Sequence, residues 1–333
     1  MSDALLRARN LRVEIATRRG PLVAVDDVSF DIAAGEVLGV VGESGAGKSI
    51  AGLAIIGLLD PPLSLTRGEI IFAGTRIDNL DPEKMRGLRG RQIGAVFQDA
   101  LASLNPLLTV GHQLVQTITA HLDLSPAEAR LRAVELLAEV GIPAPRERLA
   151  SYPHELSGGM RQRVVLALAF CCEPKLVIAD EPTTALDVSL QAQVIELIRR
   201  LCDEHGTAIM LITHDMGVIA GIADRIAVMY AGRLAEIGPA RAMLSAPAHP
   251  YTRGLMASIP RMRRMSGELP QIEGAMPRLA AIPAGCAFHP RCPQRLPRCD
   301  RDRPPLIAGR DSAAACWLTA DGRDDDIDAA RHA

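Results

Sequence analysis

The stretch Gly42-Glu43-Ser44-Gly45-Ala46-Gly47-Lys48-Ser49 constrains this chain more than any other, because it matches G-x-x-x-x-G-K-[ST] at every fixed position. The apolar run at residues 37–41 predicts a buried strand before it, and residues 50–59 predict a helix after it. A glycine-rich turn between strand and helix points backbone N–H groups at phosphate oxygens, helped by the helix dipole. We therefore expect a bound nucleoside triphosphate, with Lys48 at the β- and γ-phosphates and the Ser49 hydroxyl on Mg²⁺.

Composition narrows the class of protein. The chain has 333 residues, enough for two domains, and its 48% hydrophobic and 23% charged residues are typical of a soluble globular protein. A formal net charge of −2 argues against a nucleic-acid binder that relies on bulk positive charge. No apolar run reaches the roughly 18–20 residues of a membrane span, and the N-terminal residues lack the features of a secretory signal. We expect a cytosolic chain.

The first 240 residues alternate strand-like apolar runs with helical patterns, which predicts an α/β domain with a largely parallel sheet. Residues 11–32 resemble antiparallel strands joined by a polar turn at residues 17–20. Strands are predicted at residues 37–41, 93–97, 176–179, 208–213 and 226–230.

Three further regions follow from the pattern. Residues 98–156 predict a helical insert, in which Ser125 and Glu128 form a capping box ahead of a helix that Gly141 closes. Residues 1–240 are thus the α/β domain with its insert, and residues 241–320 are an extension rich in proline, arginine and cysteine. The acidic residues 321–333 predict a disordered tail.

A second motif follows the strand at residues 176–179, which runs into Asp180 and Glu181. At a strand end beside the phosphate-binding loop (P-loop), Asp180 is placed to hold Mg²⁺ directly or through water. Glu181 is then placed beside the γ-phosphate, where it orients or deprotonates the attacking water. Without the P-loop the same residues would be read equally well as a solvated acidic turn.

A third motif is Leu156-Ser157-Gly158-Gly159-Met160-Arg161-Gln162-Arg163, in which Ser157 predicts a helix N-cap. Gly158 and Gly159 would expose backbone N–H groups and the positive end of the helix dipole to an anion. The alternative interpretation is an ordinary glycine-containing cap.

Together these motifs resemble the ATP-binding-cassette (ABC) ATPases, whose signature helix begins with the Ser157 motif, and the resemblance covers essentially the whole chain. It implies a P-loop NTPase core with an antiparallel β subdomain and a helical insert. It also implies that Gln98 joins Mg²⁺ and the attacking water to the insert, and that His214 contacts the γ-phosphate. Asp187, in Ala185-Leu186-Asp187, belongs to the segment that crosses the dimer interface in this family.

The resemblance further implies a mechanism in which two such ATPases face each other head to tail. Each ATP lies between the P-loop of one chain and Ser157, Gly158 and Gly159 of the other, so that ATP closes the dimer and hydrolysis opens it. This chain departs from the family in two respects. Met160 stands where many members carry glutamine. The chain also has no aromatic residue before Phe30 to stack on adenine, and Arg18 or Arg19 could cover the base instead.

Several segments narrow the branch to the importer ATPases for oligopeptides and dipeptides. These segments are Ser103-Leu104-Asn105-Pro106, the Asp180–Asp187 stretch and His249-Pro250-Tyr251-Thr252. The resemblance implies a second, homologous ATPase as partner, two transmembrane permease subunits and a periplasmic solute-binding protein. We accordingly expect a peripheral protein on the cytoplasmic face of the inner membrane, with no nucleic-acid partner.

Cys286, Cys292, Cys299 and Cys316 cluster in the extension, whereas Cys171, Cys172 and Cys202 lie in apolar helical contexts and are interpreted as core residues. The four clustered thiols are a sufficient ligand set for a [4Fe–4S] cluster, towards which the family resemblance leans. Zinc and unmetallated thiols remain alternatives, although the gaps between these cysteines are wider than in most structural zinc sites.

Two other functions fit the sequence less well. A soluble ABC ATPase acting on nucleic acid or ribosomes generally carries two cassettes, a coiled-coil insertion or basic patches, and none is evident in this sequence. A P-loop kinase would complete its active site within one chain, and the Ser157 motif argues against it.

Overall fold

The structure is a computed structural model that describes residues 4–100, 102–184, 186–258 and 271–320. Two compact units can be distinguished, and each is described by itself. The first unit comprises Met1–Leu6, Ile32–Val37 and Phe72–Ile212. The second comprises Arg7–Asp31, Leu38–Ile71 and Thr213–Ala333. The predicted tail at residues 321–333 lies outside the described residues.

The first unit is built on three parallel strands in the order β6, β7, β8. These strands are β6 (Ile93–Val96), β7 (Leu176–Asp180) and β8 (Ala208–Thr213). All six residues of β8 and the first four of β7 are buried, which is the pattern of parallel strands covered on both faces. The carboxyl ends of these strands carry the acidic motif predicted from the sequence.

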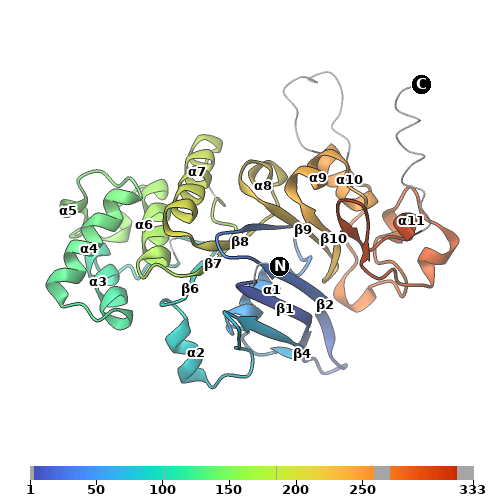
Figure 1. The fold of residues 1–333 in the computed structure, drawn as a ribbon, viewed down its shortest axis with the longest axis horizontal. Coiled ribbons are helices and arrows are strands. Elements are labelled where there is room, and N and C mark those ends of the chain that lie inside the picture. The colour runs from blue at the N-terminus through green and yellow to red at the C-terminus, as the bar shows by residue number, and fades with distance from the viewer. Residues whose placement is uncertain (1–3, 101, 185, 259–270, 321–333) are drawn as a thin grey trace. The chain divides into compact units, whose positions relative to one another are not determined.

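Helices surround this sheet, and α3, α4 and α5 form a group beside α6 (Figure 1). Helix α6 is buried along most of its length, from Gly159 to Phe170. The α-helices of this unit are α2 (Pro82–Leu88), α3 (Val110–His121), α4 (Pro126–Glu139), α5 (Pro145–Arg148), α6 (Gly158–Phe170) and α7 (Val188–His205). The short strand β5 (Thr75–Arg76) and the 3₁₀ turn η1 (Pro153–Glu155) complete it.

The second unit contains strands in the order β11, β12, β10, β9, β3. Strand β3 (Val37–Val41) is wholly buried and pairs in parallel with β9 (Arg225–Tyr230). Strand β9 pairs antiparallel with β10 (Arg233–Pro239), and β10 pairs antiparallel with β12 (Ala313–Ala314). Strand β11 (Ile307–Ala308) lies at the edge. The C-terminal extension therefore adds its own strands to this sheet.

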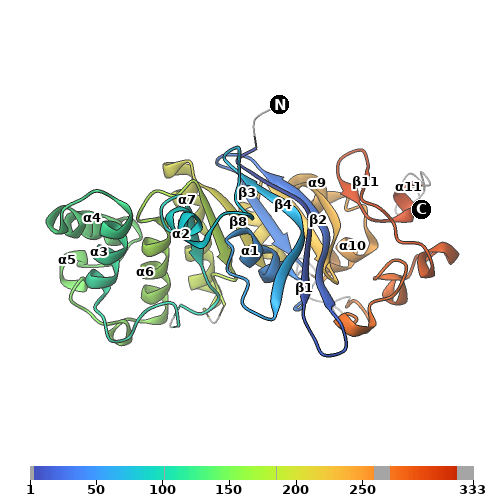
Figure 2. The ribbon, with the colours of Figure 1, turned by 90° about the horizontal axis from the view of Figure 1, so that it is seen from below.

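Three long strands lie side by side in a separate sheet of the second unit, in the order β2, β1, β4 (Figure 2). They are β1 (Leu6–Ile15), β2 (Leu22–Ile32) and β4 (Leu63–Phe72). The remaining helices of the unit are α1 (Lys48–Ile55), α8 (Met216–Ile222), α9 (Ala240–Ser245), α10 (Pro250–Ala257) and α11 (Trp317–Ala320). Three 3₁₀ turns are η2 (Leu279–Ala281), η3 (His289–Arg291) and η4 (Pro297–Asp300).

Most predicted elements are present, with shifted ends. Strands β3 and β8 have the predicted bounds, and β1 begins five residues before the predicted Leu11. Helix α1 ends at Ile55 rather than at residue 59, because Gly57 takes a φ of 62° that does not continue a helix. Within the described residues, no helix combines the length and apolar character needed to cross a membrane.

Candidate functional site

The P-loop occupies the turn between β3 and α1, as its motif predicts. Gly42 and Gly47 take φ values of 154° and 97°, and a Cβ at Gly42 would lie 2.2 Å from the Met229 carbonyl oxygen. A Cβ at Gly47 would lie 2.9 Å from the Ala24 carbonyl oxygen, so both positions require glycine. Gly47 is the N-cap of α1 and supplies no side chain to cap it. The N-terminus of α1 is thus not capped by a side chain, which suits the binding of an anion there.

Lys48 is buried at the start of α1, with 5% of its surface exposed. Its Nζ donates to the carbonyl oxygens of Gly42, at 2.8 Å, and of Glu43, at 3.1 Å. The ammonium group therefore lies across the loop that precedes it. Ser49 follows in the first turn of α1, beside this charge.

Two side chains of the C-terminal extension contact Glu43, the second residue of the P-loop. The Glu43 N–H donates to the Tyr251 hydroxyl at 2.9 Å. The Arg291 guanidinium donates through Nη1 to both carboxylate oxygens of Glu43, at 2.9 and 3.1 Å. Ser44, Gly45 and Ala46 complete the turn.

Gln98 and Glu181 meet at the carboxyl ends of β6 and β7. Gln98 Nε2 donates to Glu181 Oε2 at 3.0 Å, and the Thr184 hydroxyl donates to the same oxygen at 2.9 Å. Glu181 has a φ of 47°, an unusual backbone conformation for a non-glycine residue, and its N–H donates to the Ile212 carbonyl at 2.8 Å. Strain of this kind concentrates at functional sites. Asp180 is the last residue of β7, immediately before this carboxylate.

The Ser157 motif opens α6. Ser157 is the N-cap, and its hydroxyl accepts the Met160 N–H at 3.3 Å. Ser157 and Gly158 are exposed, whereas Gly159 is buried, where a Cβ would come within 3.3 Å of the Leu190 side chain. A glycine at this position lets the N-terminus of α6 approach α7 closely.

Asp187 has a local role that sequence reasoning did not identify. It is the N-cap of α7, and its side chain accepts the Leu190 N–H at 2.9 Å. The next residue, Val188, is an apolar side chain with 82% of its surface exposed. Ala185, two residues before Asp187, lies outside the described residues.

His214 follows β8 directly and is exposed. The next residue, Asp215, caps α8 by accepting N–H groups of Gly217, at 2.7 Å, and Val218, at 3.4 Å. The histidine is thus held between a buried strand and a capped helix.

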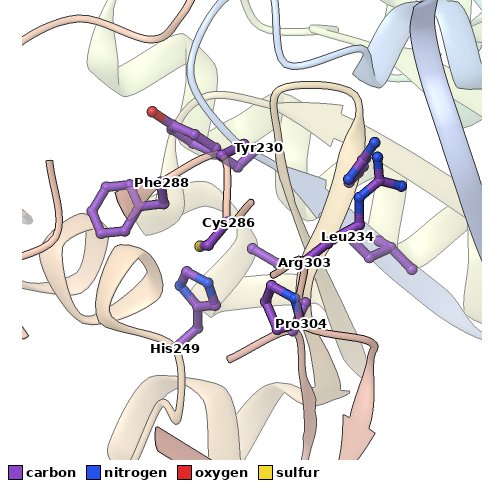
Figure 3. A pocket seen from close by; sticks show the side chains of 11 residues that line it. Tyr230, Leu234, His249, Cys286, Phe288, Arg303 and Pro304 are labelled. Atoms are coloured by element: carbon purple, nitrogen blue, oxygen red, sulfur yellow. The ribbon is translucent and has the colours of Figure 1, made fainter. Parts of the chain in front are cut away.

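The four cysteines of the extension line one cavity, together with His249, Phe288 and Trp317. The Cys286 N–H donates to the Cys299 carbonyl at 2.8 Å. Burial raises the pKa of Cys286 and of Cys316 to about 11, and burial also raises the pKa of Cys292. In the adjoining pocket, Cys286 lies among Tyr230, Phe288 and His249 (Figure 3).

These thiols do not form a ready metal centre. Among the residues that the structure describes, no group of three or more His, Cys, Asp or Glu side chains is arranged to hold a metal ion. The expected [4Fe–4S] cluster therefore has no support here beyond the convergence of four thiols of suitable chemistry. Cys171, Cys172 and Cys202 are buried and unbridged, as predicted for core residues.

The predicted site residues fall into two groups. Gln98, Ser157, Gly158, Gly159, Asp180, Glu181 and Asp187 belong to the first unit, whereas the P-loop, His214 and the four cysteines belong to the second. Within the first unit Gln98 and Glu181 are in direct contact, although 83 residues separate them. Sequence reasoning missed Tyr251 and Arg291 as neighbours of the P-loop, and only the motif at residues 249–252 drew attention to that part of the chain.

Two family models match the chain. The model described as ABC transporter matches residues 25–184, and the model described as oligopeptide/dipeptide transporter, C-terminal region, matches residues 235–299. The first match spans the P-loop and the acidic motif. The second spans Tyr251, Arg291 and three of the four clustered cysteines.

Curated relatives resemble the chain along nearly its whole length. A dipeptide transport ATP-binding protein of Bacillus subtilis is 47% identical over 319 residues, which cover 95% of each chain. An oligopeptide transport ATP-binding protein of Salmonella typhimurium is 47% identical over 311 residues, which cover 92% of this chain and 91% of the relative.

A solved structure supports the same fold. It is the dimeric, post-hydrolysis state of an ATP-binding cassette bound to ADP and phosphate, with a TM-score of 0.64 and 28% sequence identity. The match covers 71% of this chain and 99% of that one. The chain therefore belongs to the ABC transporter ATPases, and its C-terminal region is that of the oligopeptide and dipeptide transporters.

Proposed function

We propose that this chain is the ATP-hydrolysing, energy-coupling subunit of an importer for di- or oligopeptides or similar small solutes. The observation that carries this proposal is the similarity to peptide transport ATP-binding proteins over 91–95% of each chain, with the transporter-type C-terminal region included. The same similarity favours an importer over a soluble ATPase acting on nucleic acid or ribosomes.

We infer that ATP binds between the P-loop of one chain and Ser157, Gly158 and Gly159 of a partner ATPase. The N-terminus of α6 supports this, because its cap and first glycine are exposed. Val188 supports it too, since an apolar side chain with 82% of its surface exposed is suited to burial against a partner. The dimeric cassette that this chain resembles is consistent with such an arrangement.

The side chains suggest how the site works. Gln98 engages Glu181 through its amide nitrogen, so its amide oxygen is the atom left for a metal. That oxygen, the Ser49 hydroxyl and the Asp180 carboxylate are donors of the kind that Mg²⁺ prefers, and the metal would neutralise phosphate charge. Glu181, fixed by Gln98 and Thr184, then orients or deprotonates the attacking water. His214 donates a hydrogen bond to the γ-phosphate.

A groove in the first unit supports docking onto permease subunits at the cytoplasmic face of the inner membrane. It has a volume of about 420 Å³ and is lined by Phe97, Ala102 and Ser103 after β6 and by Val165, Leu168 and Ala169 of α6. Phe97 has 42% of its surface exposed. A short apolar helix of a permease would cover it, and Phe97, which lines the groove, directly precedes Gln98 in the chain.

We also propose that Cys286, Cys292, Cys299 and Cys316 hold a [4Fe–4S] cluster. Their position around one cavity supports this, as does the chemistry of four thiols. Anaerobic purification followed by iron and acid-labile sulfide analysis tests it, and about four irons per chain are expected. Zinc in place of iron, or four alkylatable thiols in a metal-free chain, would reject the cluster.

Reconstitution tests the transport function. The chain, its partner ATPase and its permeases are placed in proteoliposomes, with the solute-binding protein and peptide on one side and MgATP on the other. We expect ATP-dependent peptide uptake with wild-type protein and none with Glu181→Gln. Uptake at an equal rate without ATP, or with Glu181→Gln, would contradict the proposal.

A further inference from the structure

Arg291 belongs to the C-terminal extension, and its side chain reaches the P-loop with 7% of its side-chain surface exposed. Besides its two bonds to Glu43, its Nε donates to the Glu273 carbonyl at 2.8 Å. Its Nη2 donates to the carbonyls of Ile272 and Gly274, each at 3.3 Å. A single guanidinium thus ties the chain around residues 272–274 to the second residue of the P-loop. Arginine can do this because its three coplanar nitrogens donate in different directions, which the single ammonium group of lysine cannot do.

Tyr251 holds the same residue from a second direction. Its ring is fully buried and packs against Tyr230 and Phe288, with ring centroids 4.7 and 5.3 Å away. Because its hydroxyl accepts the Glu43 N–H, the backbone and the side chain of Glu43 are both held by the extension. The Met276 side chain adds an apolar contact, 3.2 Å from where a Cβ on Gly45 would lie.

The charges of Glu43 and Arg291 affect how the P-loop binds a nucleotide. The Glu43 carboxylate is a negative charge within a loop whose ligand is a polyanion, and Arg291 neutralises it. The contact also fixes the loop before the ligand arrives, which lowers the ordering cost of binding. Arg291 Nη1 lies 3.4 Å from the Tyr230 hydroxyl as well, so the guanidinium is itself held in place.

We propose that Arg291 is a positioning residue for the nucleotide: through Glu43, and together with Tyr251, it holds the P-loop in its binding conformation. The C-terminal extension thereby sets the affinity of the chain for the triphosphate. This inference rests on the proposed function only in that the P-loop binds ATP.

A double-mutant cycle on the full-length chain tests the inference. The dissociation constant of a fluorescent ATP analogue is measured for wild type, Arg291→Ala, Glu43→Ala and the double variant. We expect Arg291→Ala to raise the constant about three- to tenfold in the wild-type background, because the loop loses both its clamp and its charge compensation. In the Glu43→Ala background the same change is expected to have less than a twofold effect. Arg291→Lys is expected to fall between Ala and wild type.

The control is Arg303→Ala. Arg303 is also an arginine of the extension paired with a carboxylate, Asp26, at 3.2 Å, but Arg12 and Arg233 pair with that carboxylate as well. This variant is expected to bind the analogue as wild type does. Thermal melting identifies any variant that fails to fold, and Glu43→Gln then tests the same contact from the P-loop side, with an expected loss of affinity.

Steady-state hydrolysis separates positioning from general damage. In the assembled transporter, Arg291→Ala is expected to raise the KM for ATP while kcat stays within about twofold, since Glu181 and Gln98 are unchanged. An unchanged dissociation constant in Arg291→Ala, or an equal effect in both backgrounds of the cycle, would overturn the inference. A wild-type chain that binds no ATP analogue would instead refute the proposed function.

Discussion

At the scale of single residues, the backbone of Glu181 and the side chain of Gln98 belong to the hydrolytic centre that we propose. Glu181 takes a φ of 47°, a conformation that costs free energy unless its surroundings enforce it. Its N–H is bonded to Ile212, and its carboxylate is bonded to Gln98 and Thr184. These three contacts fix the carboxylate at the carboxyl end of a buried strand. A general base must lie within hydrogen-bond reach of the proton that it removes, which such fixed placement favours.

The first prediction concerns the contribution of Lys48 to nucleotide binding. Its Nζ is bonded to two P-loop carbonyls, and in the bound state it would pair with phosphate oxygens instead. Lys48→Ala removes a charge-assisted bond of about 1.5–3 kcal/mol, so the dissociation constant of an ATP analogue should rise roughly ten- to a hundredfold. Equilibrium fluorescence titration measures this dissociation constant.

A matched lysine provides the control for that measurement. Lys84 pairs with Asp81 at 3.1 Å on an exposed helix, and 72% of its side-chain surface is accessible. Lys84→Ala is expected to bind the analogue as wild type does. Equal binding by Lys48→Ala and Lys84→Ala would mean that the P-loop lysine does not contact the phosphates.

At the scale of elements, the parts whose signals are local were predictable from sequence. Ser125 and Glu128 form the capping box of α4 as expected, because both partners lie within one turn. Strand β4 was missed because only Ile70 and Phe72 of its ten residues are buried, which leaves no clear apolar run in the sequence. Strand β10 was missed although it forms a hairpin with the neighbouring β9, and its second partner, β12, is distant in sequence. Pairing partners distant in sequence leave no local pattern.

The second prediction concerns the contribution of the capping box to the stability of α4. The Ser125 hydroxyl and N–H bond to the Glu128 carboxylate, and the side-chain bond is the largest cause of the lowered pKa of Glu128. Replacing a serine N-cap by alanine costs about 1 kcal/mol. Ser125→Ala should therefore accelerate amide hydrogen exchange in the first turns of α4 roughly fivefold at neutral pH.

The pH dependence follows from the direction of that pKa shift. A carboxylate with a lowered folded-state pKa stabilises the fold above its ordinary value of 4.5, and this contribution is lost as pH falls through the folded value. The difference between Ser125→Ala and wild type should shrink in acid. Ser245→Ala serves as the control. Ser245 is the last residue of α9, and its hydroxyl donates to the Arg241 carbonyl instead of capping a helix N-terminus. If amide hydrogen exchange in α4 were accelerated as much in Ser245→Ala as in Ser125→Ala, the capping role of Ser125 would be contradicted.

At the scale of the whole molecule, the family and the chemistry could be predicted from sequence motifs. The contacts that join distant segments of the chain could not. The P-loop, the acidic motif and the Ser157 cap could be read locally, because strand, turn and cap signals span few residues. Nothing local connects Arg291 with Glu43, which lie 248 residues apart. The role of Asp187 as a helix cap was likewise hidden, since the family resemblance directed attention to a dimer interface instead.

We propose that each ATP is held by two ATPase polypeptides, which no single chain provides. Two features of this chain support the proposal: no side chain caps the N-terminus of α1, and Ser157 and Gly158 are exposed at the start of α6. Glu181→Gln should slow hydrolysis by about 10²–10⁴-fold while the amide keeps the shape of the site, so that ATP stays bound.

Light scattering tests this proposal directly, because it measures the mass of the particle that Glu181→Gln forms with its partner ATPase. We expect MgATP, but not MgADP, to produce a stable particle with the mass of two ATPase chains, and we expect Ser157→Arg to prevent it by blocking the approach of the phosphates. A one-chain particle that retains MgATP, or one that hydrolyses it at the wild-type rate, would contradict the account.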